Sequence, residues 1–122
     1  MYTKEQLSKY PYFEKLFKTT DAGSVVDSLT GLVARGYMVE FIRSLIESDI
    51  PFALALLDLD NFKFINDTYG HRIGDGVLAG VSGDLAKYLG DSGVAGRFGG
   101  DEFLIVNFRD CSYDSLKDFF AG

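Results

Sequence analysis

Two acidic pairs lie where the chemistry of a metal and a nucleotide could take place. Asp58-Leu59-Asp60 closes the most apolar run of the chain, and Asp101-Glu102 follows the Gly99-Gly100 pair. Mg²⁺ binds through one or two carboxylates together with substrate phosphates, so the two pairs predict a Mg²⁺-nucleotide site. Of the two aspartates in this motif, we expect only Asp58 to face the metal. The structural alternative for the first pair is that its carboxylates are solvated turn formers at a strand end. The alternative for the second pair is an ordinary two-glycine hairpin.

The connection between these pairs, residues 61–75, combines amides, carboxylates, cations and glycines. A carboxylate at Asp75 can accept two N–H bonds, the pattern that the N1–H and N2–H₂ edge of guanine presents, and Asn66 can both donate and accept. Lys63 can reach a phosphate, and His71, the one histidine of the chain, can make a minor contact. The alternative is an Asn-Asp turn followed by an N-capping Asp75, with Lys63 and His71 as solvated surface residues.

The hydrophobic pattern predicts the elements that must position these residues. Residues 3–18 have near-helical apolar spacing interrupted by Pro11, which predicts two short helical turns, and residues 21–28 read as a linker. The remaining prediction is a helix at about 35–48, a buried strand at 52–57, a helix at 75–89, a hairpin of strands at 94–98 and 103–108, and a last helix capped by Ser112. This order predicts an α+β fold with a mainly antiparallel sheet and flanking helices.

The composition limits the classes of function. With 122 residues and 47% hydrophobic content, the chain can form one domain with a modest core. A net charge of −6 argues against a broad basic face, so no nucleic acid polymer is expected as a partner. Cys111 is the one cysteine and the N-terminus does not resemble a signal peptide, which favours the cytoplasm. The longest apolar stretch is far below the roughly 20 residues of a membrane helix, so direct membrane contact is not expected, although a parent protein can carry an anchor elsewhere.

The order of these motifs resembles the GGDEF family, the diguanylate cyclases, over residues 27 to about 120. Several ordered motifs match by accident far more rarely than any one of them alone. The matching segments are Asp27-Ser28-Leu29-Thr30-Gly31-Leu32, Asp58-Leu59-Asp60-Asn61-Phe62-Lys63, Asn66-Asp67, Gly70-His71, Gly74-Asp75 and Arg97-Phe98-Gly99-Gly100-Asp101-Glu102-Phe103. The resemblance implies a ferredoxin-like, palm-type nucleotidyl cyclase core. It divides the chain into an N-terminal lead-in helix and linker, residues 1–26, and a catalytic domain, residues 27–122.

The resemblance also implies a reaction, in which two GTP condense into cyclic di-GMP with release of pyrophosphate, as in bacterial second-messenger signalling. Two domains that each hold one GTP must face each other, so a homodimer is implied. Asp58, the Leu59 carbonyl and Asp101 would hold Mg²⁺, with Mn²⁺ as a substitute. Asp101 would also accept the 3′-hydroxyl proton, Glu102 is the fallback for that role, and Lys63 would stabilise charge at the phosphates. The implied substrate contacts are Phe62, Lys63, Asn66, His71, Asp75, Gly99 and Gly100.

Two departures from the family pattern bear on regulation and completeness. Gly90 and Gly93 occupy the positions of the family's Arg-x-x-Asp product-inhibition site, so feedback inhibition by that route is not expected. The chain ends 20 residues after Glu102 (122 − 102), before the family's last strand and late basic residues, so we expect a domain that is incomplete at its C-terminal end. An open sheet edge and thin cover for Phe119 and Phe120 then predict self-association of the fragment.

Two other functions stay open from the sequence. The first is a GGDEF-like module that binds GTP for regulation without turnover, which the intact acidic pairs disfavour. The second is an α+β interaction domain with no nucleotide role, which requires the ordered motifs to be accidental.

Overall fold

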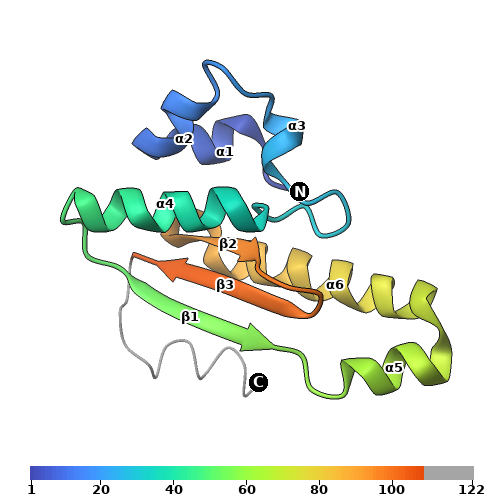
Figure 1. Ribbon diagram of the computed structural model, residues 1–122. Helices are drawn as coiled ribbons and strands as arrows, with labels where there is room; N and C mark the ends of the chain where they lie inside the picture. The colour runs from blue at the N-terminus through green and yellow to red at the C-terminus, as the bar shows by residue number, and fades with distance from the viewer. Residues whose placement is uncertain (109–122) are drawn as a thin grey trace.

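Residues 1–108 are described by the computed structural model, and the expectations for Ser112, Phe119 and Phe120 lie outside the described residues. Within these residues, four helices precede the first strand, further helices separate it from the second strand, and the last two strands follow each other directly (Figure 1). The elements are α1 (Lys4–Ser8), α2 (Pro11–Leu16), α3 (Ala22–Val25), α4 (Arg35–Glu47), β1 (Ala53–Asp58), α5 (Phe62–Tyr69), α6 (His71–Leu89), the 3-10 helix η1 (Gly90–Ser92), β2 (Gly93–Arg97) and β3 (Glu102–Asn107). The predicted α+β class is confirmed.

The three strands form an antiparallel sheet in the order β1-β3-β2 (Figure 1). Ile105 in the central strand β3 pairs with Ala55 of β1 on one side and with Ala95 of β2 on the other. Helices α5 and α6 carry the chain from one edge of the sheet to the other, so β1 and β2 run in the same direction with β3 between them. This is the split β-α-β connection of a ferredoxin-like fold, the core that the family resemblance implied.

The core lies around β2, which runs between α4 and α6 (Figure 1). Residues 93–96 are all buried, and a Cβ on Gly96 would meet the Met38 side chain of α4 at 2.6 Å. On α6, Leu78, Leu85 and Leu89 are buried at helical spacing, which gives this helix its apolar stripe. The glycine in β2 therefore allows α4 to approach the sheet closely.

The edge strand β1 is covered less than β2. Its burial alternates along the strand, and Leu54 and Leu56 are 51% and 58% exposed. They share a face with Val106 and Leu104 of β3, because directly opposed residues of an antiparallel pair point the same way. That face is therefore well covered over β2 and β3 and open over β1 within the described residues.

The N-terminal residues belong to the same hydrophobic core as the sheet. Tyr2, Leu7, Phe13 and Val25 are buried in one cluster with residues of α4, α6 and the strands. Pro11 begins α2, so the predicted interruption between two short helices is confirmed. Residues 21–28 were expected to be a linker, but they contain α3, because burial of Val25 fixes this segment against the core. The division at residues 26 and 27 stays a prediction.

The segment after β1 is helical rather than a loop, which corrects two expectations. Residues 62–69 form α5, so the Asn-Asp turn is wrong. Helix α6 begins at His71 rather than at Asp75, so an N-capping Asp75 is also wrong. The break falls at Gly70, whose φ of 89° is a conformation that other residues rarely adopt. No helix within residues 1–108 has the length and hydropathy needed to span a membrane.

Candidate active site

The acidic residues of the two motifs meet at one end of the sheet. Asp58, the last residue of β1, is the direct partner of Glu102 in β3. One position further, the Leu59 N–H donates a hydrogen bond to the Asp101 carbonyl at 3.2 Å. Asp58 and Glu102 point to the same face of the antiparallel pair, and like charges in that arrangement repel each other. A cation bound at this end of the sheet would relieve the repulsion.

The residues at this end fit a Mg²⁺ ion that is shared with a phosphorylated substrate. Asp58 and Asp101 offer carboxylate oxygens and Leu59 a backbone carbonyl, which are the hard ligands that Mg²⁺ prefers. Within residues 1–108, His, Cys, Asp and Glu side chains nowhere gather in threes as a metal site. Mg²⁺ characteristically completes its coordination with water and substrate phosphates, so two carboxylates are enough for such a site.

The turn between β2 and β3 presents Asp101 and is held by backbone bonds. The N–H groups of Phe98 and Gly99 both donate to the Glu102 carbonyl, at 2.8 and 3.3 Å. A Cβ on Gly99 would overlap the Glu102 carboxylate, so the Glu102 side chain lies over this glycine. Around Gly100, by contrast, a Cβ would meet nothing within 4 Å. The open side of the turn is therefore at Gly100.

The Arg97 side chain also supports this turn. Its Nε donates to the Gly99 carbonyl at 3.2 Å, and its Nη2 donates to the Gly100 carbonyl at 3.0 Å. The sequence analysis gave Arg97 no role of its own, although its place two residues before Gly99 was a signal. An arginine fork can hold two neighbouring carbonyl groups, which a lysine cannot do in the same geometry.

The second half of the candidate site is the pair of helices α5 and α6. A Cβ on Gly74 of α6 would overlap Oδ1 of Asn66, and it would lie 3.4 Å from the Phe62 ring. Asn66 therefore packs directly against the backbone of α6 at the position before Asp75. The sequence analysis included Gly74 in a motif but assigned it no function. Its signal was a glycine inside a helix, which is costly unless a close approach requires it.

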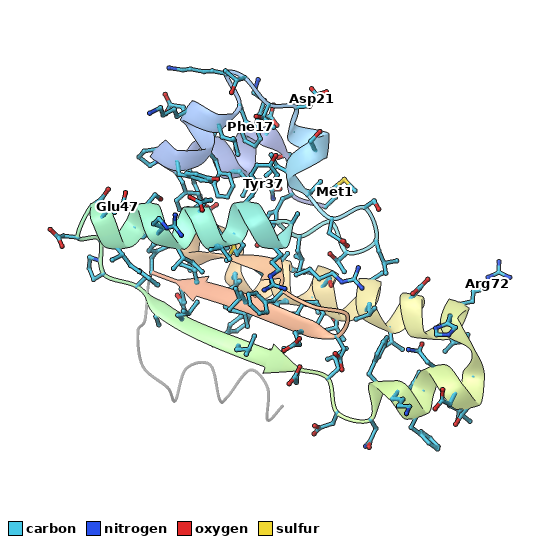
Figure 2. The ribbon with its side chains drawn as sticks, in the orientation of Figure 1. Met1, Phe17, Asp21, Tyr37, Glu47 and Arg72 are labelled. Carbon is cyan, nitrogen blue, oxygen red and sulfur yellow. The ribbon has the colours of Figure 1, made fainter. Side chains whose placement is uncertain are left out.

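The charged residues of this half are accessible to a ligand. Lys63, His71 and Asp75 are exposed, and His71 and Asp75 are four residues apart, so they lie on neighbouring turns of one face of α6. Figure 2 shows that the labelled Arg72 projects away from the sheet at the far end of α6. Arg72 therefore lies away from the acidic residues at the end of the sheet.

The predicted site residues thus lie in two groups, one at the end of the sheet and one on α5 and α6. The first contains Asp58, Leu59, Gly99, Gly100, Asp101 and Glu102, and the second contains Phe62, Lys63, Asn66, His71 and Asp75. Only residues 59–61 separate the end of β1 from the start of α5. Asn61 has a positive φ of 60°, which turns the chain sharply there. The two groups are therefore adjacent along the chain at one end of the sheet.

The family model described as "Diguanylate cyclase, GGDEF domain" matches residues 24–117. The chain therefore belongs to the GGDEF family. Diguanylate cyclase DgcP of Escherichia coli (strain K12) is 40% identical over 103 residues, which are 80% of this chain and 30% of that protein. Response regulator PleD of Caulobacter vibrioides (strain NA1000 / CB15N) is 36% identical over 121 residues, which are 93% of this chain and 27% of that protein. The chain spans less than a third of the length of these two relatives.

Solved structures of the same family share the fold. Diguanylate cyclase SiaD from Pseudomonas aeruginosa, solved in complex with its activator SiaC, has a TM-score of 0.74 and 32% identity, covering 90% of this chain and 44% of that one. The GGDEF domain of DgcB from Caulobacter crescentus, solved in complex with c-di-GMP, has a TM-score of 0.69 and 27% identity, covering 84% of this chain and 60% of that one.

Proposed function

We propose that this chain is the catalytic domain of a diguanylate cyclase, which condenses two GTP into cyclic di-GMP and releases two pyrophosphates. The observation that carries the proposal is the register of β1 and β3. It places Asp58 opposite Glu102 and Leu59 against Asp101, in a chain that belongs to the GGDEF family. The function of whole relatives supports the same reaction, since DgcP is named a diguanylate cyclase.

The metal end of the site would bind the triphosphate. Asp58, the Leu59 carbonyl and Asp101 would hold Mg²⁺, or Mn²⁺ in its place, against the phosphates. When bound, such a cation neutralises charge on the leaving pyrophosphate and lowers the pKa of a nearby hydroxyl. Lys63 on the first turn of α5 would add positive charge at the phosphates, and N–H groups near Phe62 at the start of this helix would do the same.

Each half-reaction balances with groups of this site. The 3′-hydroxyl oxygen of one GTP attacks the α-phosphorus of the other, and a new O–P bond forms. The bond between that phosphorus and the oxygen that bridges the α- and β-phosphates breaks, and pyrophosphate leaves. The hydroxyl proton passes to a carboxylate, for which Asp101 is the first choice and Glu102 the second. The open side of the turn at Gly100 leaves room for the nucleotide beside that carboxylate. A second copy of the domain must supply the other GTP, so a homodimer is part of the proposal.

The helix pair would read the base. The carboxylate of Asp75 can accept from both N1–H and N2–H₂ of guanine, while adenine presents an unprotonated N1 that would repel it. Asn66, held against Gly74, would complete the contact, with His71 beside it. The proposed substrate is therefore GTP, a cytoplasmic nucleotide, which places the reaction in the cytoplasm.

The test is to incubate the protein with GTP and Mg²⁺ and to look for the mass of a cyclic dinucleotide, with Asp101→Ala as the matched variant. The expected result is product from the unmodified protein alone, and none when ATP replaces GTP. Equal product from both proteins would remove Asp101 from the mechanism. Saturable, Mg²⁺-dependent GTP binding without product would favour the alternative, a GTP-binding regulatory module without turnover.

A further inference from the structure

The Arg97 guanidinium joins the glycine turn to a distant part of the chain. Besides its bonds to the two turn carbonyls, its Nη1 donates to both carboxylate oxygens of Asp27, at 3.2 and 3.3 Å. The two side chains are mostly buried, with 22% and 24% of their surface exposed. One guanidinium thus holds the carbonyls of Gly99 and Gly100 and pairs with a carboxylate 70 positions earlier. Such a planar fork is specific to arginine.

Asp27 is itself fixed by its local backbone. The N–H and the hydroxyl of Thr30 both donate to Asp27 Oδ2 at 2.8 Å, and the Asp27 N–H donates to the Leu32 carbonyl at 2.7 Å. Burial acts to raise the pKa of Asp27, but the hydrogen bonds from Thr30 and the charge of Arg97 together hold it below its ordinary value. The carboxylate is therefore ionised at neutral pH and can keep Arg97 in one position.

The loop that carries Asp27 is docked on the edge of the sheet. The Val33 N–H donates to the Ala95 carbonyl at 3.2 Å, and the Arg97 N–H donates to the Val33 carbonyl at 2.9 Å. Val33 also forms a parallel bridge with Gly96. A shift of residues 27–33 along β2 would therefore move Asp27 relative to the turn, and Arg97 would have to follow or release its carboxylate partner.

A turn with two successive glycines has little conformational preference of its own, so its shape depends on outside bonds. We propose that Arg97 is a positioning residue that fixes the Gly99–Gly100 turn, and that Asp27 sets the position of Arg97. Through this link residues 27–33 control where Asp101 points, and a displacement of the N-terminal segment would change the geometry of the site. The consequence for turnover rests on the proposed function, whereas the consequence for the turn does not.

The direct test is residue-resolved amide hydrogen exchange on the 122-residue protein. The reporters are the N–H groups of Phe98, Gly99 and Leu59, which are bonded within or against the turn. Arg97→Gln should speed their exchange about tenfold, the equivalent of one charge-assisted hydrogen bond, and Asp27→Asn at least about threefold. The amides of Ile105 and Ala55 in the middle of the sheet report global stability and should change less than the turn.

Two further variants separate turn positioning from simple ion pairing. Arg97→Lys keeps a positive charge for Asp27 but lacks the fork, so it should also speed exchange at the turn. The double variant Asp27→Arg with Arg97→Asp restores an ion pair, yet an aspartate at position 97 cannot donate to the carbonyls. Amide exchange at the turn of the double variant should therefore stay fast. A return to slow exchange would overturn the proposal.

The matched control is Arg43→Gln, which removes the exposed ion pair of Arg43 with Glu40 on α4 and should leave the turn unchanged. Unaltered turn exchange in Arg97→Gln would also overturn the proposal. In the GTP assay, Arg97→Gln should lower kcat with little change in KM. A normal kcat together with faster amide exchange at the turn would overturn the claim that the position of the turn controls turnover. Faster turn exchange beside a wild type that makes no product would count against the proposed function and still support the positioning role.

Discussion

The two halves of the candidate site are held in different ways. The glycine turn beside Asp101 is fixed by hydrogen bonds from β3 and from Arg97, and the Arg97 guanidinium is itself bonded to Asp27. Asn66 and Asp75 depend instead on the packing of two helices, with a single close approach at Gly74. Hydrogen bonds to charged groups fix direction, whereas helix packing fixes distance. The half that would do the chemistry is therefore anchored to the whole fold, and the half that would read the base is built locally.

The largest expected effect is on turnover and belongs to the turn. Asp101→Asn keeps the size of the side chain but removes the charge and the proton acceptor, so product formation should fall by about 10²–10⁴-fold. The measurement is the rate of cyclic dinucleotide formation from GTP with Mg²⁺. Far-ultraviolet circular dichroism should stay unchanged, because Asp101 contributes to the fold through its backbone carbonyl. Residual turnover near that of the unmodified protein would shift the role of base to Glu102.

The helix half should respond most to Gly74→Ala. The new methyl group would overlap Asn66, so we expect a loss of about 1–3 kcal/mol in the free energy of unfolding and weaker GTP binding, with the turn unaffected. Urea denaturation and nucleotide titration measure the two effects. Gly80→Ala is the matched control, since a Cβ there meets nothing within 4 Å. The control should stabilise the protein by up to about 1 kcal/mol, and equal effects of both variants would contradict the role of Gly74.

Tyr2 tests how far the turn half is anchored by the N-terminus. Its hydroxyl accepts a hydrogen bond from the buried Ala95 N–H at 3.0 Å. Tyr2→Phe leaves that N–H without this acceptor, so the free energy of unfolding should fall by about 1–2 kcal/mol at pH 7 in urea denaturation. An unchanged midpoint would show that the N-terminal segment contributes nothing to β2 through this bond.

The same residue predicts an alkaline pH dependence. Burial, as the largest cause, raises the pKa of Tyr2 to about 12, from an ordinary value of 10.0. The unfolded chain loses the proton first, so the stability that the neutral hydroxyl contributes is complete below pH 10 and is lost as pH rises through about 12. The difference in stability between the unmodified protein and Tyr2→Phe should therefore shrink over that window. A constant difference would contradict the burial of the hydroxyl.

The smallest expected change in stability is a gain, whereas Gly74→Ala and Tyr2→Phe are expected to lose stability. Asp58 and Glu102 are directly opposed on one face, and Asp58→Asn removes their repulsion. In metal-free buffer the variant should be more stable by roughly 0.5 kcal/mol, while product formation is lost. Thermal denaturation with and without Mg²⁺ measures this, because Mg²⁺ should stabilise the unmodified protein more than the variant. A variant that is less stable than the unmodified protein without metal would mean that the two carboxylates do not repel.

Most of the fold followed from local patterns. The apolar spacing predicted α4, β1 and the β2–β3 hairpin to within a residue or two, because each of these elements buries one continuous stripe or run. The segment 61–75 was predicted less well. Its helices expose several polar and apolar side chains, so the pattern did not separate helix from loop, and only the positive φ of Gly70 marks where α5 ends and α6 begins.

The sequence by itself determined the inventory of the site: the residue types, their order and the family to which the chain belongs. These follow from motifs that are contiguous in the chain. Only the tertiary structure decided which atoms meet, namely Asp58 with Glu102, Asn66 with Gly74, and Arg97 with both Asp27 and the glycine turn. Strand register and helix packing set these contacts, and no local preference of the chain does. The separation of the residues in sequence therefore does not predict which of them meet.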